Sequence, residues 1–329
     1  MKKAIFSFDY ELFFGDRSGT VIKTLIEPTN LMLDQMDRFG LKGNFFVDYL
    51  MLKYLSENKD QRSHDDLVMI KKQLQDIIRR GHRIELHIHP HWVNAKYKGD
   101  GTWDFSDFSH YSLCTFSEEE IVSMFKEGIQ ILYEVIHEVD SDYRIVAFRA
   151  GGWAVQPFSM LKKAFLEADI LIDSSTSYGI KNINKDSQYD FTHIPRRSAY
   201  RFEDEVEKES MGGTFLEVPI SSYYRFLFYK LSDRIFKFLD RKNMVKYADG
   251  THYRAADTGF PSSGVGFFHR SMYNTTCVSV LSAVMATFFS GCDLIVYIDH
   301  PKDFMMATLT SMKYISKMVK AITYKDLLV

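Results

Sequence analysis

The sequence is poor in the features that mark disulfide-rich, nucleic-acid-binding or exported proteins. Its three cysteines, Cys114, Cys277 and Cys292, are odd in number and far apart, so they fit neither a disulfide framework nor a thiolate zinc cluster. The formal net charge of −2 and the isoelectric point near 6.6 give no electrostatic reason to expect a nucleic acid partner. The chain starts MKKAIFSFDYE, and the apolar run before Asp9 is too short for a signal peptide. We therefore expect a cytoplasmic protein.

The longest apolar run, residues 278–298, is not expected to cross a membrane. Its length would suffice, but Gly291 and Asp293 divide it into a helix-like half and a strand-like half. With 329 residues, 46% of them hydrophobic, the chain can bury a full core as one large domain or two small ones. Because no internal repeat or low-complexity segment appears, we expect one domain over residues 1–329.

Short apolar segments rich in branched or aromatic residues recur along the chain and predict buried strands. They are residues 4–8, 43–47, 83–88, 145–148, 170–172, 215–220 and 294–298. Helical patterns lie between them at 29–39, 65–80 and 117–138, with Ser117 and Glu120 as a capping box and Gly40 and Gly81 as C-terminal stops. This alternation predicts a parallel sheet, either an open doubly wound sheet or a barrel. The polar segments 93–116 and 181–213 are expected to be loops at its mouth.

The segment IELHIHPHW, residues 84–92, places three histidines at alternate positions. If residues 83–89 are extended, Glu85, His87 and His89 face one side and the three intervening apolar residues face the other. Pro90 cannot donate a backbone hydrogen bond, so the strand should end there and His91 should start the next loop. Imidazoles at the end of a strand are a common beginning of a metal site.

Five of the seven predicted strands end in polar residues that can bind metal, move protons or hold charge. These residues are Asp9 and Glu11, the histidines, Arg149, Asp173 and the pair Asp299-His300. Period two places Asp9 and Glu11 on one face of the first strand, with Tyr10 opposite. Each residue alone also has a structural explanation, since buried polar groups need partners and an aspartate can cap a helix. In parallel α/β folds, however, the C-terminal strand ends share one edge and carry the chemistry.

The order of these motifs resembles the polysaccharide deacetylase family, also called the NodB homology domain or carbohydrate esterase family 4. FSFDYE resembles the first family motif, usually T-F-D-D, and GHRIELHIHPHW resembles the second, often G-H-E-I-G-x-H-x-x-x-H. FRAGGW, IDSS and IDHP resemble the third, fourth and fifth motifs, and the resemblance spans Phe6 to Pro301. It implies a distorted (β/α) barrel of about seven parallel strands, with the active site at the C-terminal strand ends. Insertions are then expected near residues 93–116, 181–213 and 223–270.

The resemblance also implies a metal site. His87 and His91, four residues apart, match the two ligand histidines of the family, and His89 becomes a neighbour that hydrogen-bonds a ligand. Tyr10 stands where the family usually has a metal-binding aspartate. Some branches use a D-x-E register, in which Glu11 is the third ligand, and the same-face argument agrees with this. Two imidazoles and a carboxylate imply a divalent ion, most simply zinc, with Mn²⁺, Co²⁺ or Ni²⁺ as alternatives.

Catalytic roles follow from the same resemblance. Asp9 matches the general base, His300 the general acid, and Arg149 would pair with Asp9, while Asp173 steadies Arg149 or His300. Zinc lowers the pKa of a bound water from 15.7 toward about 7, and a general base adds roughly 10²- to 10⁴-fold. The implied reaction is hydrolysis of an acyl group. Candidate walls of an acyl or sugar pocket, each of which could equally be core, are Trp92, Trp153 and Ile298.

The substrate we expect is an acetylated or formylated amino sugar on a nucleotide- or lipid-linked precursor of a surface polysaccharide, because no export signal is present. Arg196 and Arg197 in PRRSAYR could clasp its phosphate. Residues 223–242 interleave aromatic and basic side chains at helical spacing, so this helix could lie on an anionic membrane, at its inner face. The alternative is a core helix with a solvated basic side.

Two other functions fit the sequence. The same scaffold could hydrolyse small non-sugar amides. Alternatively, Tyr10 could mark a site that has lost its metal, which would leave a carbohydrate-binding pseudoenzyme. The sequence predicts no oligomeric state.

Overall fold

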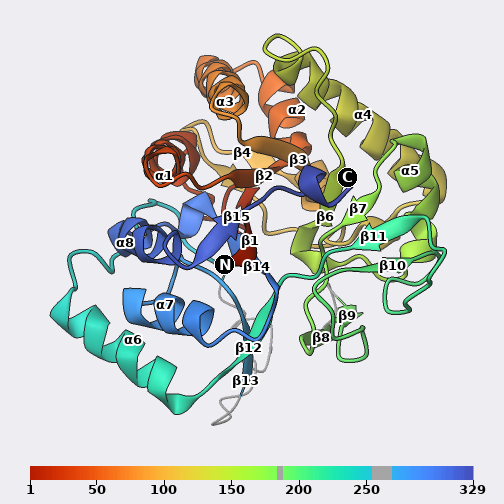
Figure 1. Cartoon of the computed structure of the whole chain (residues 1–329). Coiled ribbons are helices and arrows are strands. Elements are labelled where there is room, and N and C mark those ends of the chain that lie inside the picture. Colours follow the sequence, from red (N-terminus) through yellow and green to blue (C-terminus); the bar gives the residue numbers. More distant parts are fainter. Residues whose placement is uncertain (184–187, 254–268, 329) are drawn as a thin grey trace.

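The computed structural model describes residues 1–183, 188–253 and 269–328, and its centre is a curled, mostly parallel sheet (Figure 1). The strands lie in the order β10-β11-β7-β6-β3-β2-β1-β14, and β15 also pairs with β1. Every pair is parallel except β10 with β11. The bounds are β1 Lys2–Tyr10, β2 Gly43–Asp48, β3 Arg83–Ile88, β6 Ala147–Ala150, β7 Ile172–Asp173, β10 Tyr200–Phe202, β11 Phe215–Glu217, β14 Leu294–Asp299 and β15 Val319–Ala321.

Hydrogen bonds link β14, at one end of this sheet, to the segment after β11, near the other end. Ser221, which follows β11, donates its backbone N–H to the Val296 carbonyl in β14 at 3.0 Å. The Ser221 hydroxyl accepts the Val296 N–H at 2.9 Å. The predicted distorted barrel is therefore confirmed, and the seven predicted strands correspond to β1, β2, β3, β6, β7, β11 and β14.

Helices surround the sheet on its outer side (Figure 1). They are α1 Glu27–Arg38, α2 Tyr49–Glu57, α3 Gln61–Arg79, α4 Glu118–Ile136, α5 Lys162–Glu167, α6 Leu227–Leu239, α7 Val280–Phe288 and α8 Met306–Ile315. The capping box at the start of α4 is present, since Ser117 and Glu120 exchange hydrogen bonds. Gly40 and Gly81 adopt φ of +64° and +72°, a left-handed conformation that ends α1 and α3. Among the helices described, none is long and apolar enough to cross a membrane.

Side chains inside the barrel change from apolar to polar toward the C-terminal strand ends. Ile5, Phe46, Ala147, Ile172 and Val296 form one buried apolar cluster. Because side chains alternate along β1, Ser7 and Asp9 share the inner face with Ile5. The polar residues at the C-terminal end therefore lie in one layer, on an apolar floor that fixes the strands.

Several elements were not predicted from the sequence. Helices α2, α5 and α8 were missed. The segment 181–213 is not only loop: it contains β8 (Lys181–Ile183), β9 (Gln188–Asp190) and β10, which extends the main sheet. These three-residue strands lack a hydrophobic alternation long enough to recognise. The segment 93–116 contains the short pair β4 (Lys96–Tyr97) and β5 (Trp103–Asp104). Residues 184–187 and 254–268, within two of the predicted insertions, lie outside the described residues, and the single domain stays a prediction.

Candidate active site

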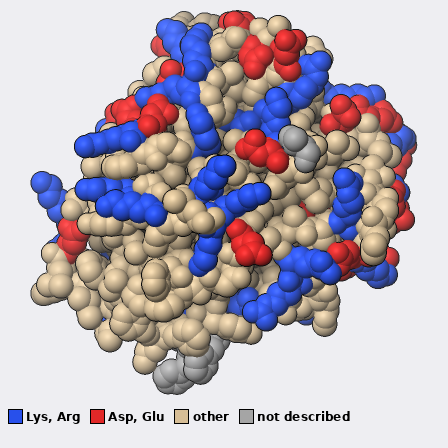
Figure 2. All heavy atoms as spheres, in the orientation of Figure 1, with Lys and Arg blue, Asp and Glu red and all other residues tan. Residues whose placement is uncertain are grey.

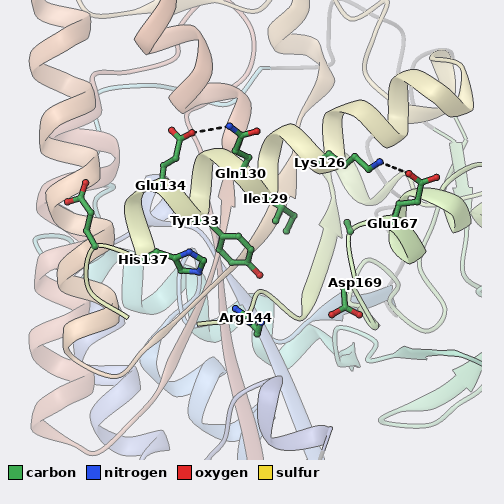
Figure 3. Close-up of a pocket in the computed structure, with 11 residues that line it drawn as sticks. Lys126, Ile129, Gln130, Tyr133, Glu134, His137, Arg144, Glu167 and Asp169 are labelled. Atoms are coloured by element: carbon green, nitrogen blue, oxygen red, sulfur yellow. Dashed lines mark hydrogen bonds and ion pairs between the residues drawn. The ribbon is translucent and has the colours of Figure 1, made fainter. Parts of the chain in front are cut away.

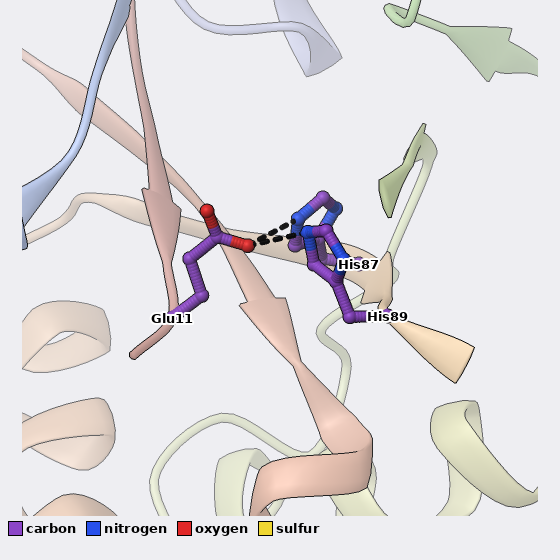
Figure 4. Close-up of side chains that lie close together, drawn as sticks. All are labelled: Glu11, His87 and His89. Carbon is purple, nitrogen blue, oxygen red and sulfur yellow. Dashed lines mark hydrogen bonds and ion pairs between the residues drawn. The ribbon is translucent and has the colours of Figure 1, made fainter. Parts of the chain in front are cut away.

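Glu11, His87 and His89 meet at the C-terminal ends of β1 and β3 (Figure 4). Glu11 Oε2 lies 3.2 Å from His87 Nε2 and 2.5 Å from His89 Nε2. All three side chains are buried. Tyr10, between Asp9 and Glu11 in sequence, points to the opposite side of β1 and donates its hydroxyl to Gln73 at 2.7 Å. The predicted same-face arrangement of Asp9 and Glu11 is therefore correct.

The ring of His87 is oriented by the backbone of β6. Its Nδ1 donates to the Arg149 carbonyl at 2.7 Å, which leaves Nε2 pointing at Glu11. One carboxylate oxygen thus faces two ring nitrogens, an arrangement that needs either protons or a cation between them. Burial lowers the pKa of His87, but the Asp9 and Glu11 carboxylates outweigh burial and the pKa is raised above its usual value. Burial lowers the pKa of His89 to about 4, so its ring is neutral near pH 7.

Lys302 supplies a positive charge that the sequence analysis did not anticipate. Its Nζ lies 2.7 Å from Glu11 Oε1 and 3.1 Å from the Leu12 carbonyl, and the side chain is only 2% exposed. The ammonium also lies 4.2 Å from the centroid of the Phe14 ring. Burial raises the pKa of Glu11, but the charge of Lys302 and the hydrogen bonds with His87 and His89 hold it well below its usual value. Lys302 follows His300 by two residues, so the strand-end argument could have placed Lys302 at this edge, but not its contact with Glu11.

Asp9 and Arg149 form a buried ion pair inside the barrel. Arg149 NH1 lies 2.5 Å from Asp9 Oδ1, and both side chains are almost fully buried. Burial alone would raise the pKa of Asp9, but the charges of Arg149 and His87 and the nearby His300 hold it far below its usual value. Asp9 is therefore ionised at neutral pH, as a general base must be.

The rest of the Arg149 guanidinium is also bonded. NH2 donates to Ser7 Oγ at 2.9 Å, to Ser174 Oγ at 3.2 Å and to Tyr324 OH at 3.2 Å. Nε donates to the Ser174 carbonyl at 2.8 Å. These contacts fix the planar group in one orientation and so aim Asp9 toward the mouth of the barrel. No pattern in the sequence indicated Ser7 or Tyr324.

His300 connects Asp9 with solvent. Its Nε2 lies 3.5 Å from Asp9 Oδ2 and 3.6 Å from Glu11 Oε1. Its side chain is 20% exposed, whereas those of Asp9 and Glu11 are 4% exposed, so a substrate would meet His300 first. Burial lowers the pKa of His300, but the hydrogen bond and charge of Asp9 outweigh burial and raise it above its usual value. The protonated ring can therefore donate a proton to a leaving group.

His91 lies beside this group rather than in it. Its ring packs 4.9 Å from that of His89 and 4.8 Å from that of Phe14. Among the described residues, two groups of three His, Cys, Asp or Glu have ligand atoms that all lie within 4.8 Å of one another. They are Glu11, His87 and His89, and Asp9, Glu11 and His300. The role of His91 as a metal ligand stays a prediction. In the structure it is His89 that lies beside Glu11 and His87.

Two buried ring nitrogens show where a further ligand would fit. His89 Nδ1 and His91 Nδ1 have no hydrogen-bond partner within the described parts of the chain. Buried polar atoms without a partner are rare and often mark a site for a water or an ion. These Nδ1 atoms are not the nitrogens that face Glu11. The Glu11 carboxylate with His87 Nε2 and His89 Nε2 gives one carboxylate and two imidazoles, a donor set that fits a zinc-type ion.

The other predicted site residues are spread more widely. Asp173 accepts Ser175 N–H at 3.0 Å and the Ser175 hydroxyl at 2.7 Å, and the neighbouring Ser174, not Asp173, contacts Arg149. Trp92 is buried and donates Nε1–H to Asp48 at 2.7 Å, which makes it core. Four further candidates also lie apart from this group. Ile298 is buried in β14, Trp153 is partly buried after β6, and Arg196 and Arg197 line a separate pocket.

One cavity of the described structure lies away from the candidate site. A cavity of about 850 Å³ is lined by α4 residues together with Arg144 and Asp169 (Figure 3). Arg144 and Asp169 precede β6 and β7, so this cavity lies toward the N-terminal strand ends, whereas the site residues lie at the C-terminal ends. It therefore gives no support to catalysis there.

Solved structures of similar fold were found, although no family model and no curated protein sequence matches the chain. A protein from Mycobacterium smegmatis assigned as a polysaccharide deacetylase is 16% identical, with a TM-score of 0.48 over 99% of this chain and 88% of its own. A family 4 carbohydrate esterase from Streptomyces lividans is 10% identical, with a TM-score of 0.40 over 96% and 87%. A 4-alpha-glucanotransferase from Thermococcus litoralis is 14% identical, with a TM-score of 0.49 over 99% and 38%.

Polysaccharide deacetylases recur among these structures. Further examples are peptidoglycan deacetylases, at 11% identity and TM-scores of 0.44 and 0.40. At such identities and TM-scores these structures carry no argument about activity, which has to be argued from the site itself.

Proposed function

We propose that this protein is a metal-dependent hydrolase that removes an acetyl or formyl group from the nitrogen of an amino sugar. The observation that carries the proposal is the ionised, buried Asp9 beside the partly exposed His300, directly next to Glu11, His87 and His89. An anionic base, a cationic acid and a carboxylate-imidazole donor set within one strand edge are the parts that amide hydrolysis needs.

The residues divide the work between holding a cation and moving protons. Glu11, His87 and a second imidazole would hold a divalent ion, which would supply a water of lowered pKa and polarise the acyl oxygen. Asp9 accepts a proton from the attacking water, since Arg149 keeps the carboxylate ionised and aimed. His300 donates its proton to the departing amine, and its exposure lets the sugar reach it.

The substrate we propose is an intracellular nucleotide- or lipid-linked precursor of a surface polysaccharide, used in the cytoplasm or at the inner face of the membrane. Zinc is the ion we favour. A metal-free carbohydrate-binding protein is the second candidate, because the Lys302 ammonium already neutralises Glu11. Hydrolysis of small non-sugar amides would use the same groups. A screen that compares acetamido sugars with ureides and simple amides as substrates distinguishes this function from sugar deacylation.

Metal content of the purified protein, measured without chelators together with acetate release, tests the proposal. We expect about one divalent ion per chain in the wild type and none in His87→Ala, because His87 is held in place by Arg149 and faces Glu11. Comparing His89→Ala with His91→Ala identifies the third ligand. The 2.5 Å contact of His89 with Glu11 favours loss of metal in His89→Ala.

Each outcome of this experiment has a definite meaning. If His91→Ala lost its metal and His89→Ala kept it, His91 would be the third ligand, four residues after His87, as the motif resemblance implies. A wild-type protein that holds no metal and releases no acetate would overturn the hydrolase and leave the binding protein. Val93→Ala, an exposed position near the histidines, serves as the control that should keep its metal.

Lys302→Met gives a second test, on stability. Without the ammonium, Glu11 loses a buried counter-charge. We therefore expect the free energy of unfolding of the metal-free variant to be about 2–4 kcal/mol lower than that of the metal-free wild type. A zinc ion would replace that charge, so added zinc should raise the melting temperature of the variant more than that of the wild type. Differential scanning calorimetry measures both, with the half-exposed pair Lys53–Glu127 as control in Lys53→Met. If zinc raised the melting temperature of Lys302→Met less than that of the wild type, Lys302 would not occupy the position of the metal's charge beside Glu11.

A further inference from the structure

Helix α6 is attached to the protein by its polar side. Its buried residues are Tyr229, Ser232 and Asp233. Ser232 Oγ lies 2.7 Å from Ser282 Oγ of α7, and Asp233 accepts the Ser279 N–H at 2.8 Å. A surface helix of a soluble protein normally buries its apolar side, so α6 is inverted.

The opposite side of α6 is apolar and exposed. Leu227, Leu231, Ile235 and Phe238 recur at spacings of three and four and thus share one side of the helix. Phe238 is 84% exposed, and Phe289 at the end of α7 is 66% exposed. We call the following residues the apolar surface: Phe226, Leu227, Phe228, Leu231, Ile235, Phe238, Leu239, Phe288 and Phe289, all of them exposed. Apolar patches of this kind mark interaction sites.

The apolar surface lies at the periphery of the molecule. Figure 1 shows α6 as the outermost helix of its side, with α7 between it and the sheet. Figure 2 shows a broad area there with few charged side chains. Residues of α6 are therefore accessible to a large flat partner.

Positive charge accompanies this surface. Residues 227–242 contain five Lys or Arg and two Asp, and one of these acids, Asp233, is buried and paired with Arg225. At 100° per residue, Lys230, Arg234 and Lys237 lie on the side of α6 that borders its apolar side. A short helix with an apolar side, flanked by Lys and Arg, is the pattern of a helix that lies in the headgroup region of a bilayer.

A basic pocket opens beside the same surface. It has a volume of about 680 Å³ and is lined by Arg196, Arg197 and Arg270 together with Phe226 and Phe289. The Arg270 guanidinium lies 4.6 Å from the Tyr178 ring and 4.3 Å from the Tyr224 ring, which holds its charge in place. Asp293 also lines the pocket, but the three arginines outnumber it, so the net charge of the pocket is positive. Arginines next to an apolar surface match the phosphates of anionic lipid headgroups.

We propose that the apolar surface docks on an anionic phospholipid membrane, with the α6 cations and the basic pocket at the level of the headgroups. The partner is chosen by charge, because apolar side chains bordered by cations complement a negatively charged bilayer. The docking does not depend on hydrolysis. The segment after α6 reaches the candidate active site, because Lys246 pairs with Asp303, which lies beside His300. If the proposed function also holds, docking through α6 would therefore bring the site close to the membrane and favour a lipid-linked substrate.

Sedimentation of the full chain with vesicles tests the docking. We expect binding to vesicles of phosphatidylcholine with phosphatidylglycerol, little binding to phosphatidylcholine alone, and weaker binding at high salt. Leu231→Ser and Phe238→Ser should each reduce the partition coefficient about tenfold or more, since each removes a large apolar side chain from the contact. Lys237→Glu should reduce it about fivefold or more.

Leu166→Ser, an exposed apolar position on α5, is the matched control and should bind like the wild type. Circular dichroism and metal content establish that each variant is folded. A wild-type chain that stays in the supernatant, equal binding to both vesicle types, or unchanged binding of Phe238→Ser would each overturn the proposal. A dimer seen by light scattering, dissociated by Phe238→Ser and without affinity for vesicles, would assign the surface to a second copy of this chain instead. A wild-type chain that binds vesicles but releases no acetate would contradict the proposed hydrolase function and leave the docking proposal intact.

Discussion

Asp9→Asn is expected to lower the turnover number by about 10²- to 10⁴-fold, the range that general-base catalysis contributes. The amide cannot accept a proton from water near neutral pH. Its oxygen can still accept the hydrogen bond that Arg149 NH1 donates to Asp9 Oδ1, so the geometry should persist. Glu11, His87 and His89 are untouched, and the variant should keep its metal.

The same substitution should change the pH dependence of the remaining activity. The carboxylate of Asp9 is what raises the pKa of His300 against the effect of burial. Removing that charge lowers the pKa, so His300 loses its proton at lower pH and the alkaline limb of the pH–rate profile should move to lower pH. Acetate release between about pH 5 and 9, with metal content measured on the same samples, checks both expectations.

The control for this variant is Asp66→Asn. Asp66 is also a buried aspartate, on α3 and away from the strand ends, and burial raises its pKa to about 6. It should keep full turnover, which separates the loss of a base from the loss of any buried carboxylate. An Asp9→Asn protein with wild-type turnover would remove Asp9 from the mechanism.

The sequence allowed the sheet and its polar edge to be predicted because both depend on short-range patterns. Buried strands such as β3 are continuous runs of apolar or alternating residues, and period two alone puts Asp9 and Glu11 together and turns Tyr10 away. The C-terminal edge rule then collects residues that are far apart in sequence, such as Arg149 and His300. That argument needs no side-chain geometry.

What depends on contacts between distant side chains could not be predicted in the same way. The approach of Lys302 to Glu11 requires the turn after β14, and the choice of His89 or His91 beside Glu11 depends on how the chain leaves β3 at Pro90. The inversion of α6 is another case. Its helical period is visible in the sequence, but only the hydrogen bonds of Ser232 and Asp233 show which side faces the protein.

Arg149→Met is expected to have the largest effect on stability. Arg149 is fully buried, and its removal would leave the buried Asp9 carboxylate without its counter-charge. Breaking a buried ion pair on one side typically costs about 3–5 kcal/mol. Ser7 and Tyr324 would also lose hydrogen bonds, which adds to the loss. A cost of this size is a large fraction of the stability of an ordinary domain.

Urea unfolding of a double-mutant cycle measures this effect. Arg149→Met alone should lower the free energy of unfolding by about 3–5 kcal/mol, whereas the double variant Asp9→Asn/Arg149→Met should be less destabilised than the sum of the single variants, because no uncompensated charge is left. Arg197→Met is the control: its exposed pair with Glu209 should contribute about 0–1 kcal/mol. Strict additivity in the cycle would mean that Asp9 and Arg149 are not coupled. Arg149 could then no longer be the residue that keeps the base ionised.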